Sequence, residues 1–265
     1  MNCKITIKKG GIVLIFLFIL SSFSFAKEKL NSISNIELIN IAAKQRMLSQ
    51  RIAKDYLYIG KNIATSKANK QLKKSLEEFS TTHEKLLKII KDPEIKNLLD
   101  FVSLSLEDLK NTINKKFTID NAQLVLDLSE SMLEGNQYIV NTLKKSMDLK
   151  GSDIISTVGK QRMLSQRIAK YYIAYQLGIK DKNSVTSMKD TVKEFSDNLN
   201  ILRTNGSNTL EINTKLAKIT KLWKIVNKFY NNIEKGGLPL IVFNTTDNIT
   251  QEMDEVTNMF VDIKK

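Results

Sequence analysis

The chain has 265 residues and a formal net charge of +13; 42% of its residues are hydrophobic, and it contains only two prolines and ten glycines. This composition allows long helices and a buried core, in one large domain or two ordinary ones. The basic residues are interleaved with Asp and Glu and form neither a Lys/Arg block nor an aromatic-basic surface motif. The usual pattern of a nucleic-acid-binding protein is therefore excluded.

The first 26 residues have the pattern of a secretory signal peptide. Three lysines precede an unbroken apolar run over residues 12–20, and Ser24-Phe25-Ala26 supplies the small residues of a cleavage site. We expect residues 1–26 to be removed and the mature chain to be periplasmic or secreted. The apolar run is short for a membrane span, so an uncleaved N-terminal anchor is the less favoured alternative. Cys3, the only cysteine, lies in this segment, so we expect no disulfide in the mature chain.

An eleven-residue sequence, which we call the signature, occurs twice. Residues 44–54 and residues 160–170 both read KQRMLSQRIAK, and further identities downstream keep the same spacing. Internal identity of this length predicts a tandem duplication. We expect copy one to cover residues 27–150 and copy two to cover residues 151–265.

Helix start and stop signals divide each copy into four predicted helices. Asp92-Pro93 resembles an N-cap followed by proline at the first helical position, and Asp120 with Gln123 resembles a capping box. No segment shows the sustained period-two alternation of a strand. The predicted helices cover residues 33–62, 67–91, 93–115 and 120–150 in copy one, and 152–177, 184–204, 207–235 and 239–265 in copy two.

Long helices joined by short loops favour antiparallel neighbours. We therefore expect an all-α fold of two tandem antiparallel four-helix bundles that form a pseudo-dimer. A short joint at Gly151 can place the bundles side by side about a pseudo-two-fold axis. A continuous helix through Gly151 would instead stack them end to end, and glycine inside a helix costs only about 1 kcal/mol, so both arrangements remain open.

On a helical wheel, the first signature helix has two apolar stripes. The first predicts the core face of the bundle and comprises Ile41, Leu48, Ile52 and Ile59. The second consists of small and apolar residues, which predicts close packing against another helix, yet it carries an arginine at its centre in both copies. Its members are Ile39, Ala42, Arg46, Ala53 and Leu57 in copy one and Ile155, Val158, Arg162, Ala169 and Ile173 in copy two.

A guanidinium group in a packed seam is costly unless an anion or several acceptors meet it. If the two first helices face each other, Arg46 and Arg162 approach across the pseudo-two-fold axis and can share a small anion, which suits the planar fork of arginine. The alternative is a salt bridge from Arg46 to a carboxylate on the fourth helix, such as Glu130 or Glu134. The predicted ligand-binding residues are Arg46, Arg162, Ser49, Gln50, Ser165 and Gln166.

A second arginine pair lies on the more polar side of the same helices. We interpret Arg51 and Arg167 as solvated or salt-bridged residues, with a secondary ligand-binding role as the alternative. Met47 and Met163, on the same side, are interpreted as packing residues.

We expect from the sequence that the protein is not an enzyme and that it binds neither a metal nor a cofactor. His83 is the only histidine and is interpreted as a surface residue, because the adjacent Glu84 points elsewhere on a helix. No Glu-x-x-His pair is present for a di-metal site in a helical bundle.

The signature and its lead-in, Ile39-Asn40-Ile41-Ala42, resemble the periplasmic domain of type IV pilus chemotaxis transducers of the PilJ kind. That domain is similar to the ligand-binding domain of nitrate/nitrite sensor kinases of the NarX type. The resemblance implies a four-helix bundle that dimerises through its first and last helices, with nitrate held between an arginine from each first helix. Those arginines correspond to Arg46 and Arg162, and the second motif arginine corresponds to Arg51 and Arg167.

The chain departs from the nitrate sensors in the residues between the two arginines, where it has MLSQ, so nitrate specificity does not transfer. Family members usually continue into a transmembrane helix and a signalling module, whereas this chain stops at Lys265. We therefore expect an exported ligand-binding sensory module that binds a small, nitrate-like oxyanion between its repeats and reports to a membrane chemoreceptor or histidine kinase. The alternative is a ligand-free adaptor or structural bundle that binds another protein.

Overall fold

The computed structural model describes residues 33–147 and 152–264, and residues 35–265 form one compact unit. This described part of the chain contains eight α-helices, one short 3-10 helix and no strand, so the predicted all-α helical-bundle fold is confirmed. The predicted signal peptide and the predicted joint at Gly151 lie outside the described residues.

The helices form two rings of four. In order, they are α2 (Asn35–Gly60), α3 (Thr65–Ile89), α4 (Pro93–Ile113), α5 (Ile119–Met147), α6 (Ser152–Gln176), α7 (Lys182–Arg203), α8 (Leu210–Asn231), the 3-10 helix η1 (Ile233–Lys235) and α9 (Pro239–Lys264). In the first ring α2 contacts α3 and α5, and α4 contacts both of these helices. In the second ring α6 contacts α7 and α9, and α8 contacts both of these. Each ring is a four-helix bundle.

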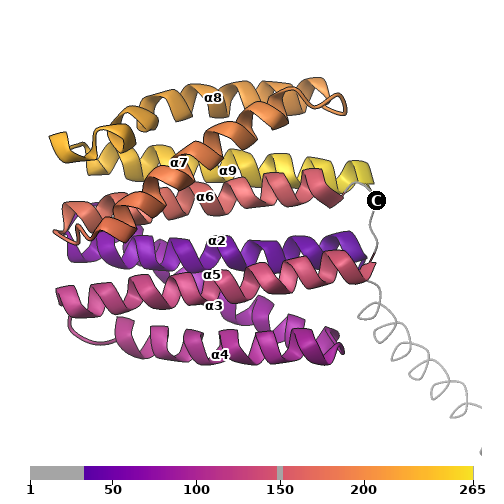
Figure 1. The fold of residues 1–265 in the computed structure, drawn as a ribbon, viewed down its shortest axis with the longest axis horizontal. Helices are drawn as coiled ribbons and strands as arrows, with labels where there is room; N and C mark the ends of the chain where they lie inside the picture. The colour runs from indigo at the N-terminus through magenta and orange to yellow at the C-terminus, as the bar shows by residue number, and fades with distance from the viewer. Residues whose placement is uncertain (1–32, 148–151, 265) are drawn as a thin grey trace, which may run out of the picture. The chain divides into compact units, whose positions relative to one another are not determined.

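The two bundles meet along α2 and α6, which lie side by side in the middle of Figure 1. These helices run parallel. Near the start of α2, Asn40 accepts a hydrogen bond from Arg162 of α6 at 2.9 Å. Beyond the end of α2, Lys61 donates to the backbone carbonyl of Gln176 at 2.6 Å. The bundles are therefore arranged side by side and not end to end.

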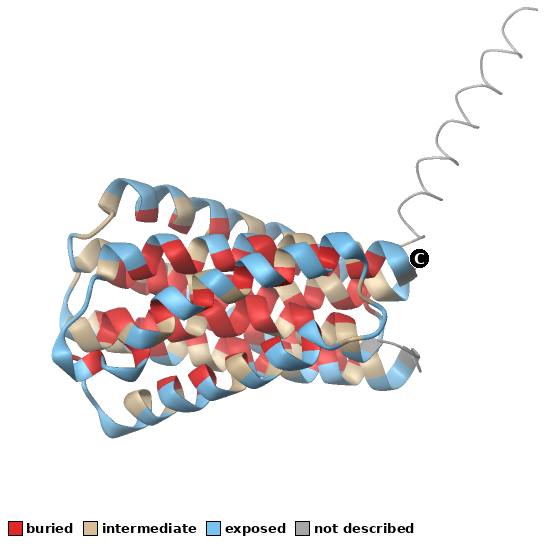
Figure 2. Ribbon diagram, turned by 90° about the horizontal axis from the view of Figure 1, so that it is seen from above, coloured by how far each residue is buried: buried red, intermediate tan, exposed pale blue. Residues whose placement is uncertain are grey.

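The helix α2 is covered on almost every side, because α3, α5 and α6 all pack against it. Leu48 and Ile52 of the predicted core stripe are fully buried, and so are Ala42 and Leu57 of the second stripe. Figure 2 shows that the buried residues gather where the helices face one another. A helix buried in this way also buries the polar residues of its signature, which must then find partners inside the protein.

The first glutamine of each signature makes the same hydrogen bond in both copies. Gln45 Nε2 donates to the backbone carbonyl of Phe79 on α3 at 3.2 Å. Gln161 Nε2 donates to the carbonyl of Phe195 on α7 at 2.9 Å. The duplicated glutamine therefore fastens the first helix of each bundle to the second.

One of the two predicted helix caps is confirmed. The Asp92 carboxylate accepts the backbone N–H of Ile95 at 3.0 Å at the start of α4. The predicted capping box at Asp120 is wrong, because α5 already begins at Ile119. The hydroxyl of Thr118 accepts the N–H of Asn121 at 3.1 Å and caps this helix, so Asp120 lies in the first turn, where its charge complements the helix dipole.

Gly159 lies where α2 and α6 are in contact. It is buried on α6, and a Cβ atom built there would lie 3.5 Å from the Ala43 side chain and 3.4 Å from Nη2 of Arg162. These are ordinary van der Waals distances, so a methyl group fits at this position and a larger side chain does not.

We predict that Gly159→Leu lowers the free energy of unfolding by about 1–3 kcal/mol, because the larger side chain overpacks the seam. Gly159→Ala is the matched control. It is expected to be neutral or to stabilise by up to about 1 kcal/mol, because alanine favours the helix more than glycine does. Urea denaturation of the three proteins measures both effects. Equal stability of the Leu and Ala variants would show that the seam is loosely packed.

Candidate functional site

Arg46 and Arg162 face each other across the seam between α2 and α6. Each side chain is only 1% exposed. The Nη2 atoms of Arg46 and Arg162 lie 3.8 and 3.4 Å from the point where Gly159 would carry a Cβ atom. The structure therefore brings together the two arginines that the sequence predicts to meet.

The partners of the two arginines differ. Arg162 forms a salt bridge with Asp254 of α9 and donates to Asn40. Arg46 donates through Nη1 to the side-chain oxygen of Gln137 on α5 at 2.5 Å, and its buried Nη2 has no hydrogen-bond partner in the described residues. The alternative of a salt bridge from Arg46 to Glu130 or Glu134 is wrong, since the partner on the fourth helix is an amide.

The electrostatics of the pair follow from these partners. Burial and, to a lesser extent, the nearby charge of Arg162 together lower the pKa of Arg46 to about 10. Burial also lowers the pKa of Arg162, although the Asp254 carboxylate opposes this effect. In the described residues only Arg162 of the pair has a carboxylate as an ion-pair partner, while Glu194 acts on Arg46 and Glu78 on Arg162 from a greater distance, so the close contacts leave positive charge in the seam that an anion can neutralise.

The four flanking residues make their hydrogen bonds inside their own bundles. Ser49 Oγ donates to the Arg46 carbonyl and Ser165 Oγ to the Arg162 carbonyl, both at 2.9 Å. Gln50 Nε2 donates to the carbonyl of Ser129 on α5 at 2.8 Å, and Gln166 Nε2 donates to the Thr250 hydroxyl on α9 at 2.6 Å. In the structure the two glutamines fasten the first helix to the fourth, and the predicted contacts of all four side chains with a ligand stay a prediction.

The last lysine of each signature forms an ion pair with the other bundle. Lys54 Nζ lies 2.7 Å from an Asp247 oxygen on α9, and Lys170 pairs with Glu130 on α5. Both lysine side chains are fully buried. These reciprocal pairs, which we call the crossed ion pairs, join each first helix to the fourth helix of the opposite copy. The sequence analysis missed them, because a lysine at the end of an amphipathic signature is typical of an exposed position.

Burial and pairing shift the pKa values of these groups. Burial lowers the pKa of Lys170 to about 8, although Glu130 opposes it. Burial alone would raise the pKa of Glu130, but Lys170 and Arg167 outweigh it and bring the value to about 2. Asp247 is likewise lowered to about 2, because Lys54 outweighs the effect of burial. The carboxylates of the crossed ion pairs therefore stay ionised at neutral pH.

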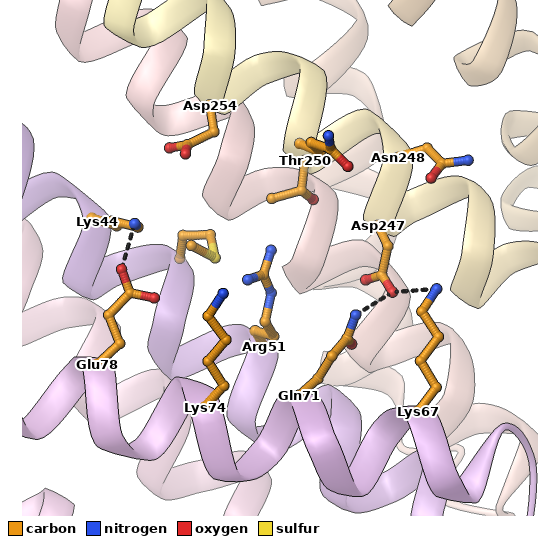
Figure 3. Close-up of a pocket in the computed structure, with 12 residues that line it drawn as sticks. Lys44, Arg51, Lys67, Gln71, Lys74, Glu78, Asp247, Asn248, Thr250 and Asp254 are labelled. Atoms are coloured by element: carbon orange, nitrogen blue, oxygen red, sulfur yellow. Dashed lines mark hydrogen bonds and ion pairs between the residues drawn. The ribbon is translucent and has the colours of Figure 1, made fainter.

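Two clefts lie beside the seam in pseudo-symmetric positions. The Arg51 cleft, of about 370 Å³, is lined by residues of α2, α3 and α9 (Figure 3). The Arg167 cleft, of about 480 Å³, is lined by residues of α5, α6 and α7. Each cleft is thus formed by the first and second helices of one copy and the fourth helix of the other. Arg46 and Arg162 line neither of these two clefts.

The second arginine pair is not equivalent in the two clefts. Arg167 binds Glu130 through Nε and Nη2, with Nε 3.1 and 3.2 Å from the two carboxylate oxygens. This salt bridge agrees with the interpretation of Arg167 as a salt-bridged residue. Arg51, in contrast, forms no hydrogen bond and no ion pair within the part of the chain that the structure describes, and its Nε is buried.

His83 is buried, so its interpretation as a surface residue is wrong. Its side chain is 3% exposed, and its Nε2 lies 2.8 Å from the Ser103 hydroxyl on α4. Burial lowers its pKa. The Phe79 ring stacks on the imidazole, with 5.9 Å between the ring centroids. His83 therefore belongs to the packing between α3 and α4.

Within residues 33–147 and 152–264, no group of three or more His, Cys, Asp or Glu side chains could hold a metal ion. The helices in these ranges also include none that is long and apolar enough to span a membrane.

The family model of PilJ, described as "Type IV pili methyl-accepting chemotaxis transducer N-term", matches residues 34–115 and 146–256. The two matched segments together make up more than half of the chain, and each contains one signature. No curated protein and no solved structure matches the chain.

Asp55, which follows the first signature, is a buried carboxyl group whose ionisation affects the stability of the fold. It is fully buried, and its ion pair in the described residues is with Lys54 at 3.2 Å. Burial raises its pKa from 3.8 to about 7, although Lys54 opposes the shift. Between pH 3.8 and about 7 the folded protein therefore holds a proton that the unfolded chain has released, so this group's contribution to stability is lost as pH rises through that window.

We predict that Asp55→Asn removes this loss, because asparagine does not titrate and Lys54 keeps Asp247 as its partner. Relative to the wild type, the variant should gain about 1–4 kcal/mol of unfolding free energy between pH 4 and pH 7.5. Denaturant unfolding at several pH values measures the difference. The exposed carboxylate Asp100 is the control, since Asp100→Asn should change stability little at any of these pH values. A difference between Asp55→Asn and wild type that is independent of pH would contradict the assignment.

Proposed function

Because the chain belongs to the PilJ family of type IV pili methyl-accepting chemotaxis transducer N-terminal domains, we propose that it is a sensory module that binds a small oxyanion between its two signature helices. In this proposal the protein is exported and acts in the periplasm or outside the cell. It carries out no chemical reaction on its ligand.

The observation that supports the proposal most strongly is the unmatched charge of the arginine pair. Arg46 and Arg162 are both buried, only Arg162 has a carboxylate partner, and Nη2 of Arg46 has no hydrogen-bond partner among the described residues. An oxyanion such as nitrate would accept hydrogen bonds from both guanidinium groups and reduce their mutual repulsion. The seam at Ala43 and Gly159 is closely packed, which favours a small ligand.

The position of the pair also supports a signalling role. The helices α2 and α6 contact each other and also contact the fourth helices of their own bundles. A ligand that draws the two arginines together changes the packing of α2 against α6, and the crossed ion pairs connect this seam to α5 and α9. A membrane chemoreceptor or histidine kinase that contacts these helices would detect the difference.

One observation favours the alternative of a ligand-free interaction module. Arg162 already has Asp254 and Asn40 as partners, so half of the pair is satisfied without an anion. In that case the seam would serve only to hold two bundles together, and the function would lie in a surface that binds another protein.

We predict that nitrate, nitrite or another small oxyanion raises the melting temperature of the purified protein. Two charge-assisted contacts correspond to micromolar to millimolar affinity, and a ligand at about ten times its Kd stabilises by about 1.4 kcal/mol, or about 2–4 °C. Nitrate, nitrite, sulfate and phosphate should each be tested at about 10 mM against chloride of equal ionic strength.

Arg46→Ala should abolish this shift, because it removes the guanidinium that lacks a carboxylate partner. Arg203→Ala, which removes an exposed arginine of α7, is the matched control and should keep the shift. If no anion in the panel stabilises the protein, the proposal of an oxyanion sensor fails and the ligand-free interaction module takes its place.

A further inference from the structure

The Arg51 cleft differs from its pseudo-symmetric counterpart in a way that points to a ligand. We propose that it is a binding site for a small organic acid, with the carboxylate held by Arg51 and further attraction from Lys74. This site is separate from the arginine pair of the seam, and the proposal does not depend on an anion bound there.

The first step concerns the carboxylate on the fourth helix. In the Arg167 cleft Glu130 binds both Lys170 and Arg167. In the Arg51 cleft the corresponding residue is Asp247, whose side chain is shorter by one methylene group. One oxygen of Asp247 is taken by Lys54, and the other accepts a hydrogen bond from Gln71 at 2.7 Å. Within the described residues no carboxylate forms an ion pair with Arg51, although its charge is near enough to Asp247 and Asp55 to lower the pKa of both.

The second step concerns the charges that remain. Figure 3 shows the Arg51 and Lys74 side chains pointing into the cleft. Within the described residues neither of them has a hydrogen bond or an ion pair, whereas the other charged residues of the lining are paired. These pairs are Lys44 with Glu78, Lys67 with Asp247, and Asp254 with the buried Arg162. The Arg51 cleft therefore presents two positively charged side chains that have no ion-pair partner in the described residues.

The Arg167 cleft has the opposite character. Lys160 pairs with Glu194 and Arg167 pairs with Glu130, while the lining residue Glu134 has no ion pair in the described part of the chain. The corresponding position on α9 is Gln251, which lines the Arg51 cleft without a charge. The two clefts thus share the same arrangement of helices, but the unpaired charge of the lining is positive in the Arg51 cleft and negative in the Arg167 cleft.

The third step concerns the class of ligand. The planar guanidinium fork of Arg51 matches a carboxylate, which it can bind through two hydrogen bonds. A volume of about 370 Å³ lies in the range of sites for small organic molecules and exceeds the size of a nitrate ion. Asn248 and Gln251 of α9 add amide groups to the wall, which suit the hydroxyl or second carboxylate of such an acid.

The test uses succinate and malate as probes, with acetate as a smaller monocarboxylate. Isothermal titration calorimetry and melting curves on the purified protein should show binding of succinate or malate, with a melting shift of about 2 °C or more at about 10 mM in solutions of matched ionic strength. Arg51→Gln should weaken binding about tenfold or more, and Lys74→Ala should weaken it less. Lys73→Ala, beside Lys74 but outside the cleft lining, should leave binding unchanged.

A second variant closes the site without removing a positive charge. Asp247→Glu should place a longer carboxylate where it reaches both Lys54 and Arg51, as Glu130 reaches Lys170 and Arg167. We expect this variant to fold and to lose succinate binding. Far-ultraviolet circular dichroism and the melting temperature without ligand establish that each variant is folded.

The outcomes separate the two sites. Binding of succinate or malate that survives Arg46→Ala and is lost in Arg51→Gln supports the proposal. Three results would overturn it: no binding of any of the three acids, binding that persists in Arg51→Gln and Asp247→Glu, or binding that is lost in Arg46→Ala. Arg51→Gln leaves both guanidinium groups of the arginine pair in place, so nitrate can still bind there and failure of one site does not imply failure of the other.

Discussion

The burial of α2 and α6 on almost every side is the constraint on which the rest of the structure depends. A polar side chain on such a helix must be satisfied by a neighbouring helix, or it lowers stability. Gln45 meets α3, Gln50 meets α5, Lys54 meets α9, and Arg46 lies against α6. Successive polar residues of the signature thus point to different neighbours, so one short sequence defines the position of a helix within its own bundle and against the other.

Much of this architecture could be predicted from the sequence. The repeated signature and the punctuation between helices predict the eight helices, and the small-residue stripe predicts that another helix packs closely on each first helix. These features can be read from one sequence, because they are local or follow from the periodicity of a helix. Whether Arg46 and Arg162 meet in one seam depends on a side-by-side arrangement of the bundles, which the sequence left open against an end-to-end one.

The partners of these residues could not be predicted, because they depend on contacts between distant segments. Nothing in the sequence shows that Lys54 reaches Asp247 or that Glu130 belongs to Arg167 and Lys170. The burial of His83 was missed because it results from the packing of α4 on α3. The two identical signatures also concealed the difference between Arg51 and Arg167, because it lies in residues of other helices, such as Glu130 and Asp247 on the two fourth helices.

The parallel contact of α2 and α6 lies within one polypeptide, and this has a consequence for how the interface behaves on dilution. Two separate chains that met through facing arginines would tend to dissociate at low concentration. Covalent linkage gives the two halves an effective concentration in the millimolar range or above, whatever the number of molecules in solution. A repulsive pair can therefore persist at the centre of the contact at any concentration of the protein.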